Sequence, residues 1–149
     1  MIVSSPEALL GSNIKNYIQQ HVPTIAESAT IDEAVDALKN SPLHVLYTVK
    51  EDGALSGVIT SCDLAKLNNP QKPTKALDLA TTTNVIGVKQ TAELWQLLKI
   101  MNGENAARKN FEQLPVLDKD NKPVGIITKV ALRETLSEVQ IPTRSLVSA

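Results

Sequence analysis

Two stretches of the chain carry apolar residues at intervals of three and four, which is the period of an amphipathic helix. Thr30 and Glu33 have the spacing of a capping box at the start of the first stretch, and Thr91 stands at the matching start of the second. The pattern predicts one helix in each half of the chain. The apolar positions of the pattern are Ile31, Ala34, Val35 and Leu38 in the first helix, and Leu94, Leu97, Leu98 and Met101 in the second.

A short apolar segment precedes each predicted helix, and two more follow it. The two that follow are divided by residues that tolerate a positive φ, at 51–53 and 119–121, as in a β-hairpin. Another helix is expected directly after each hairpin, at Ser61–Asn68 and at Lys129–Val139. Each half therefore has the predicted order β-α-β-β-α. The apolar segments are 23–25, 46–49 and 57–60 in the first half, and 85–88, 114–117 and 125–128 in the second.

The two halves form an internal repeat. The segment Gly57–Leu64 resembles Gly125–Leu132 at an offset of 68 residues, and the same offset continues upstream through both hairpins without a gap. The helix starts Thr30 and Thr91 differ by only 61 residues, so the second half holds about seven extra residues, which lie within 102–112. This extra loop is either a solvated connection or a partner-facing lip over a ligand site.

The repeat predicts four parts of the chain. Residues 1–20 hold a leading helix from Pro6 to about Gln20, capped by Ser5 and with Leu10, Ile14 and Tyr17 as its apolar stripe. The first repeat is expected at 21–70 and the second at 71–141, joined through a turn-rich linker around 68–73. Residues 142–149 form a tail.

Composition excludes several kinds of partner. The 149 residues are 42% hydrophobic, which is enough for one compact domain or for two small ones that share a core. The net charge of −1 argues against nucleic acid, because proteins that bind it have a basic excess. No apolar run approaches the roughly 18 residues of a membrane span, and the first residues lack a secretory signal pattern. The single cysteine, Cys62, fits a reducing compartment, so we expect a cytoplasmic protein.

The end of each hairpin carries the most specific motif. Gly57-Val58-Ile59-Thr60 is followed by Asp63, three residues after the threonine, and Gly125-Ile126-Ile127-Thr128 occupies the same place in the second half. A tandem β-α-β-β-α repeat with this motif resembles the CBS domain family, and two such repeats resemble a Bateman module. The resemblance covers roughly residues 20–140. It implies a mixed α/β (α+β) fold with two repeats packed about a pseudo-twofold axis, and two clefts between them for an adenosine-containing ligand.

A nucleoside cleft needs an acceptor for the ribose hydroxyls, flat walls for the base, and hydroxyl or N–H groups for any phosphate. Asp63 is expected to accept from the ribose hydroxyls, while Thr60 and Ser61 face the phosphate. The alternative is that Asp63 only caps the helix that it begins. By the resemblance, the walls of this cleft come from the other repeat. These wall residues are Asn84, Val85, Ile86, Leu114, Pro115 and Val116.

The second cleft departs from the family pattern. Thr128 is present, but Ala131 stands in place of the aspartate and cannot accept a hydroxyl hydrogen bond. Tyr47 replaces a smaller proline in its wall. Lys129 is either a phosphate ligand or an ordinary exposed lysine. This weaker cleft would be walled by Pro23, Thr24, Ile25, Val45 and Leu46.

No catalytic triad, paired carboxylates, phosphate loop or metal-ligand cluster appears in the sequence, so we expect neither an enzyme nor a metal site. The first functional hypothesis is a sensor of energy state or of an adenosyl metabolite, which binds AMP, ADP, ATP or S-adenosylmethionine and signals to an unidentified protein or domain. The second is a homodimerisation or docking module that needs no ligand. A third is a regulatory piece of a larger transporter or enzyme.

Overall fold

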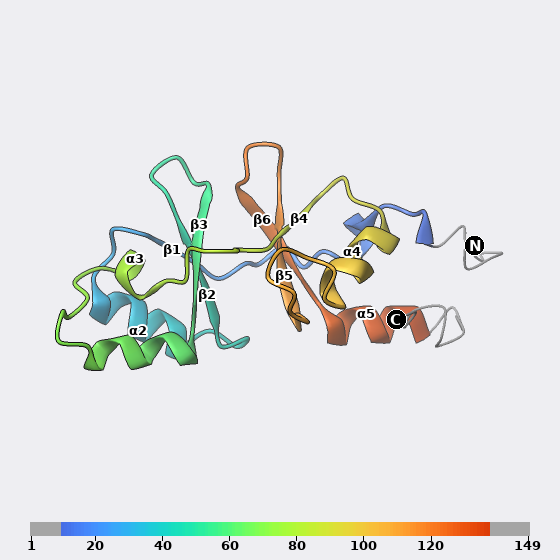
Figure 1. Ribbon diagram of the computed structural model, residues 1–149. Helices are drawn as coiled ribbons and strands as arrows, with labels where there is room; N and C mark the ends of the chain where they lie inside the picture. Colours follow the sequence, from blue (N-terminus) through green and yellow to red (C-terminus); the bar gives the residue numbers. More distant parts are fainter. Residues whose placement is uncertain (1–9, 138–149) are drawn as a thin grey trace. The chain divides into compact units, whose positions relative to one another are not determined.

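The computed structural model describes residues 10–137, with side chains as far as Glu134. Figure 1 shows two small sheets, each with helices beside it. The first half contains η1 (Ile14–Tyr17), β1 (Thr24–Ala26), α2 (Ile31–Lys39), β2 (Val45–Val49), β3 (Leu55–Thr60) and η2 (Ser61–Asn68). The second contains α3 (Ala76–Leu79), β4 (Val88–Lys89), α4 (Leu94–Met101), β5 (Gln113–Leu117), β6 (Pro123–Thr128) and α5 (Lys129–Ser137). The predicted β-α-β-β-α order is confirmed in both halves, with η2 as a 3-10 rather than an α-helix.

The two sheets have the same topology. Their strand orders are β1-β2-β3 and β4-β5-β6, with β1 parallel to β2 and β4 parallel to β5. Strands β2 and β3 are antiparallel, with Val45 opposite Thr60. The hairpin turns hold positive φ at Gly53 (92°) and Asn121 (62°), as the turn residues predict.

The compact units do not coincide with the halves of the sequence. Among residues 10–137, one unit contains residues 22–85 and 120–123, and the other contains 10–21, 86–119 and 124–137. Helix α3 therefore belongs with the sheet β1-β2-β3, although it follows the first repeat, and η1 belongs with β4-β5-β6. Each unit has its own apolar core. In the unit that contains residues 22–85, the buried core residues are Ala34, Leu38, Leu46, Ile59, Ala76, Leu79 and Ala80. Those of the other are Ile14, Tyr17, Val88, Leu94, Leu97, Met101, Leu114, Val116, Ile127 and Leu132.

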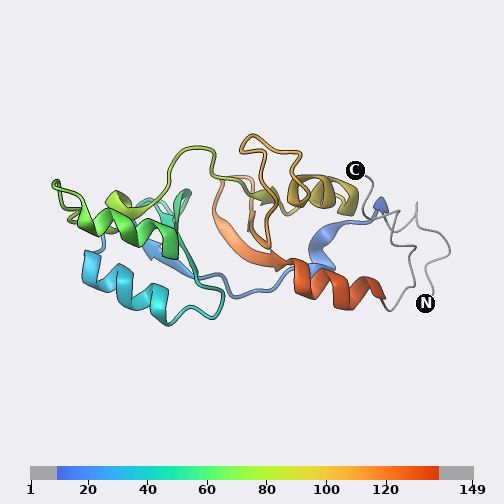
Figure 2. The same cartoon turned by 60° about the horizontal axis from the view of Figure 1, so that its bottom comes forward.

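The two amphipathic helices form where the apolar period predicts them. Thr30 caps α2, since its hydroxyl accepts from the Glu33 N–H at 3.2 Å and its own N–H donates to Glu33 Oε1 at 3.1 Å. Helix α4 starts two residues later than expected, because Glu93 is its cap and donates its N–H to Gln96 Oε1 at 2.9 Å. Figure 2 shows α2 and η2 side by side next to the first sheet.

The predicted leading helix is wrong for residues 11–20. The chain turns after Leu10, and Asn13 caps a single 3-10 turn through its side-chain oxygen, which accepts from the Lys15 N–H at 2.8 Å. Ile14 and Tyr17 of the predicted stripe are indeed buried, but they fill the core beside β5 and β6 from this short turn. Tertiary packing thus uses an apolar pattern that a helix would also satisfy. Ser5, Pro6, Val139 and the tail lie outside the described residues.

Two crossing segments explain the glycine of the repeated motif. Thr81 pairs with Val58 of β3, and Gln19 pairs in the same way with Ile126 of β6. A Cβ on Gly57 would lie 2.9 Å from Ala80 Cβ and 3.0 Å from the Thr81 carbonyl oxygen. A Cβ on Gly125 would lie 2.7 Å from the Gln19 carbonyl oxygen. Each glycine therefore stands where another part of the backbone crosses the last strand too closely for a side chain.

The extra loop at 102–112 is folded by one asparagine. Asn105 donates from its side-chain nitrogen to the carbonyls of Ile100 and Lys109, both at 2.8 Å. Phe111 packs against the core, and its N–H donates to the Met101 carbonyl at 3.0 Å. The loop is therefore tied to the end of α4; its expected role as a lip over a ligand stays a prediction.

Tyr47 provides a test of this packing at alkaline pH. The side chain is buried in β2, and burial raises the pKa of its phenol above the ordinary value of about 10. The folded state therefore keeps the phenol neutral where the unfolded state ionises it. Its contribution to stability is complete below pH 10 and is lost as the pH rises, at up to about 1.4 kcal/mol per pH unit. In urea unfolding, the free energy of unfolding of the wild type should fall relative to that of the Tyr47→Phe chain between pH 10 and 11.5. A constant difference between the two chains would contradict the burial of an uncharged phenol.

Candidate functional site

Asp63 lies where β3 ends and η2 begins. The strand stops at Thr60, which keeps an extended backbone, and Asp63 is the third residue of the helical segment that follows. Its Oδ2 accepts from the Thr60 N–H at 2.9 Å and from the Thr60 hydroxyl at 3.3 Å. One oxygen of the carboxylate therefore closes the junction between strand and helix.

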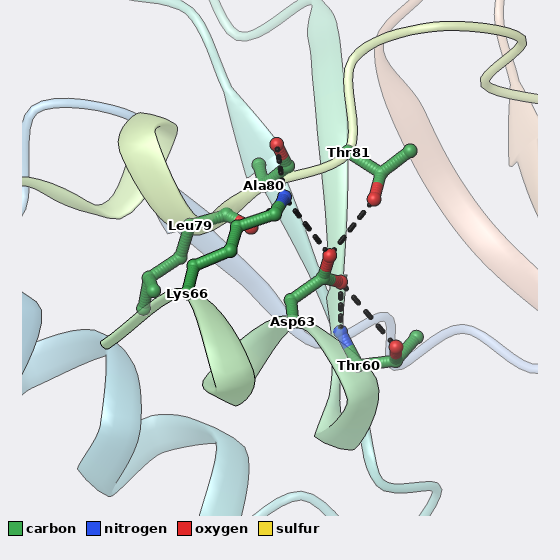
Figure 3. Close-up of polar contacts among 6 residues, drawn as sticks. All are labelled: Thr60, Asp63, Lys66, Leu79, Ala80 and Thr81. Atoms are coloured by element: carbon green, nitrogen blue, oxygen red, sulfur yellow. Dashed lines mark hydrogen bonds and ion pairs between the residues drawn. The ribbon is translucent and has the colours of Figure 1, made fainter. Parts of the chain in front are cut away.

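The other carboxylate oxygen joins η2 to the segment after α3. Oδ1 of Asp63 accepts from the Thr81 hydroxyl at 2.9 Å and lies 3.1 Å from Lys66 Nζ. The same ammonium donates to the carbonyls of Leu79 at 2.8 Å and Ala80 at 3.3 Å, at the end of α3. Figure 3 shows Thr60, Thr81 and Lys66 around the Asp63 carboxylate, with Leu79 and Ala80 beside Lys66. Asp63 and Lys66 thus hold together three segments of one compact unit.

The carboxylate is buried and its acceptor positions are used. Asp63 is only 7% exposed, and its two oxygens together receive a backbone N–H, two hydroxyls and an ammonium. Two carboxylate oxygens offer about four acceptor positions. Lys66 is 36% exposed, so solvent screens its pairing in part. A ligand hydroxyl that binds Asp63 must therefore take the place of a donor already present.

The structure divides the predicted site residues between the two units. Thr60, Ser61 and Asp63 lie together with Asn84 and Val85 in one unit, and Ser61 and Asn84 are exposed. Asn84 has a positive φ of 54°. The remaining predicted wall residues, Ile86, Leu114, Pro115 and Val116, belong to the other unit. Their assignment to the Asp63 cleft stays a prediction.

The second motif closes its helix in a different way. The Thr128 hydroxyl accepts from the Ala131 N–H at 3.1 Å, so the threonine itself caps α5. The Lys129 N–H donates to the Glu112 carbonyl at 2.8 Å. The predicted walls of this cleft lie in the other unit, which contains Pro23, Thr24, Ile25, Val45 and Leu46. Val45 and Leu46 are buried there, and no carboxylate corresponds to Asp63.

Lys66 and Thr81 were missed from the sequence. Lys66 follows Asp63 by three residues, a spacing that places two side chains on one face of a helix, so it was detectable. Thr81 is 18 residues from Asp63 and carries no local signal. Within residues 10–137, no three His, Cys, Asp or Glu side chains gather to hold a metal ion, and no helix is long and apolar enough to cross a membrane.

The sequence model of the CBS domain matches this chain twice, over residues 14–68 and 76–138. The chain belongs to the CBS domain family. Its mixed α/β fold is that of known CBS pairs, as the sequence resemblance predicted. The duplicated Gly-apolar-apolar-Thr motif ends the last strand of each CBS domain.

Three known proteins illustrate the similarity. Inosine-5′-monophosphate dehydrogenase of Methanocaldococcus jannaschii is 27% identical over 121 residues, which are 81% of this chain but 22% of that enzyme. The CBS pair of protein MJ0100, solved with 5′-methylthioadenosine and S-adenosyl-L-methionine, is 26% identical with a TM-score of 0.65; the match covers 85% of this chain and 97% of that one. CBSX2 in complex with AMP has a TM-score of 0.71 at 20% identity, over 88% and 100% of the two chains. The CBS pair thus spans less than a quarter of the dehydrogenase.

Proposed function

We propose that this CBS pair is a non-catalytic regulatory module that binds an adenosine-containing ligand through Asp63 and signals the bound state to a partner protein or domain. The buried Asp63 carboxylate carries this proposal. Two of the four groups that it accepts from are threonine hydroxyls, the chemistry that the two hydroxyls of a ribose offer. The site is therefore suited to a diol.

The ligands of similar CBS pairs support the adenosine class. AMP is bound by CBSX2, and 5′-methylthioadenosine and S-adenosyl-L-methionine are bound by MJ0100. All three contain an adenosyl group with both ribose hydroxyls. By the family resemblance, the adenine would lie between Asn84–Ile86 and Leu114–Val116, while Thr60 and Ser61 face the 5′ substituent.

We propose one adenosine site per chain. The second motif has Ala131 where the first has Asp63, and an alanine methyl group accepts no hydrogen bond. Lys129 would attract an anion there but would not hold a ribose. A partner then reads the state of the Asp63 site through an equilibrium that the ligand shifts, which requires different ligand affinities in the two states.

Calorimetric titration of the full chain with AMP, ADP, ATP and S-adenosylmethionine tests the proposal. One of them is expected to bind, and Asp63→Ala should weaken it at least tenfold, because hydrogen bonds to a charged group contribute about 1.5–3 kcal/mol each. Lys129→Ala is the matched control and should change the affinity less than twofold. Circular dichroism checks that both variants are folded at the titration temperature. Equal affinities in the wild-type and Asp63→Ala chains would reject the site.

A groove between α2 and η2 favours a second function, homodimerisation. The groove has a volume of about 580 Å³ within one compact unit. Its lining combines two aspartates and two lysines with apolar residues, and a second copy related by a twofold axis could pair acid with base. The groove is lined by Ile31, Asp32, Val35, Asp36, Lys39, Leu67, Lys72 and Pro73. Sedimentation as a dimer, without binding of any of the four compounds, would replace the sensor by a docking module.

A further inference from the structure

The four donors on Asp63 differ in how easily they leave. The Thr60 N–H belongs to the start of η2 and is fixed by the backbone. The Lys66 ammonium is held by two carbonyls of the α3 end in addition to the carboxylate. The hydroxyls of Thr60 and Thr81 each turn about one side-chain bond, and solvent can replace their acceptor. A ligand diol can therefore displace these two hydroxyls without unfolding either helix.

The two hydroxyls are not equivalent. The Thr60 hydroxyl lies 3.3 Å from Oδ2, an oxygen that also receives the Thr60 N–H at 2.9 Å. The Thr81 hydroxyl lies 2.9 Å from Oδ1, within the ordinary range of an O–H···O hydrogen bond and closer than the Thr60 hydroxyl is to Oδ2. Displacing Thr81 therefore costs more free energy than displacing Thr60.

Thr81 also anchors a segment of backbone. Its N–H donates to the Val58 carbonyl at 2.8 Å, and its carbonyl accepts from the Val58 N–H at 3.0 Å. The residue extends the sheet beyond β3 by this one pair, directly over Gly57. The Thr81 side chain is exposed, so its bond to Asp63 connects this edge pair to the buried carboxylate.

We propose that the Thr81 hydroxyl occupies the acceptor position on Asp63 that a ribose hydroxyl takes in the complex. Thr81 is thus an internal competitor of the ligand. When the ligand hydroxyl donates to Oδ1, the Thr81 hydroxyl turns to water, and the pair between Thr81 and Val58 loses its side-chain anchor. This inference rests on the proposed adenosine site and names the residue that sets its affinity.

Competition has a reciprocal consequence. If the ligand weakens the Thr81 anchor, then removal of the anchor must tighten ligand binding by the same factor. Thr81→Val keeps the shape of the side chain and removes only the hydroxyl. Because the net contribution of one hydrogen bond corresponds to about a three- to tenfold change in an equilibrium constant, we expect AMP to bind about three- to tenfold more tightly to this variant.

The experiment compares Thr81→Val with Thr81→Ser in the full chain. Calorimetry with AMP should give a tighter complex for the valine variant and a wild-type affinity for the serine variant, which keeps the hydroxyl. With 2′-deoxy-AMP and 3′-deoxy-AMP, the gain from Thr81→Val should disappear for the compound that lacks the competing hydroxyl. In the wild-type chain, AMP should also increase hydrogen exchange at the Thr81 and Val58 amides.

The outcomes separate this inference from the proposed function. Unchanged or weaker AMP binding by Thr81→Val, in a chain whose Asp63→Ala variant has lost binding, overturns the inference and leaves the adenosine site standing. A gain that is equal for AMP and both deoxy compounds also overturns it. If AMP does not bind to the wild-type chain, the inference is overturned, and the proposed function stands only if another of the four compounds binds through Asp63.

Discussion

The Asp63→Ala substitution is expected to lower the free energy of unfolding by about 3 kcal/mol relative to the wild type. The substitution removes the acceptor of a backbone N–H, of the Thr81 hydroxyl and of the Lys66 ammonium. A donor that is left without its acceptor costs about 1–3 kcal/mol, and three donors lose theirs. We take the lower end because Lys66 is 36% exposed and keeps two carbonyl partners. Chemical denaturation followed by circular dichroism measures the change.

Asp63→Asn is the matched control for this prediction. The amide keeps an oxygen that can accept from the Thr60 N–H, but it removes the negative charge beside Lys66. Its loss of stability should be about half that of the alanine variant. If both variants lie within about 0.5 kcal/mol of the wild type, as ordinary surface substitutions do, the contacts of Asp63 contribute little to the fold.

Gly125→Ala is expected to destabilise the other unit by about 3 kcal/mol, the upper part of the range for overpacking. The new Cβ would lie 2.7 Å from the Gln19 carbonyl oxygen and would also overlap Ile18 Cγ2. The backbone at Gln19 would have to move away from β6, which breaks both hydrogen bonds between Gln19 and Ile126. Urea denaturation gives the change, and hydrogen exchange at Ile126 should rise with it.

Gly57→Ala is the corresponding change in the other repeat. Its Cβ would meet side-chain atoms of Ala80 and Thr48 at 2.9 Å and the Thr81 carbonyl at 3.0 Å. Because these contacts are longer and involve small side chains, we expect a smaller loss of about 1–2 kcal/mol. If the Gly57→Ala chain is less stable than the Gly125→Ala chain, these distances do not predict which substitution costs more stability.

Local signals carried most of the fold prediction. The helix periods, the Thr30 capping box and the turns at Gly53 and Asn121 each involve residues within a few positions of one another, and all are present in the structure. The leading helix failed because the same apolar residues, Ile14 and Tyr17, fit either a helix or a short turn packed on a sheet. Only tertiary contacts distinguish the two.

The candidate site shows the same limit. Asp63 was identifiable from its distance to Thr60, and Lys66 from its spacing along the helix. Thr81 was not, since it reaches the carboxylate across 18 residues. The motif glycine was recognised as part of a repeat, but its physical reason depends on a backbone segment that comes from outside the hairpin. Sequence spacing therefore located the carboxylate but not the groups that compete for it.

Because η1 belongs to the unit of the second sheet and α3 to the unit of the first, neither repeat can be inherited as a complete folding unit. A gene that encoded only residues 76–138 would carry Thr81 without Val58, its partner on β3, and β6 without Gln19. Each compact unit therefore needs one segment that lies outside the repeat that supplies its sheet. Under selection for stability, a lone copy is at a disadvantage, and the two repeats are expected to be gained, lost and transferred between genes together.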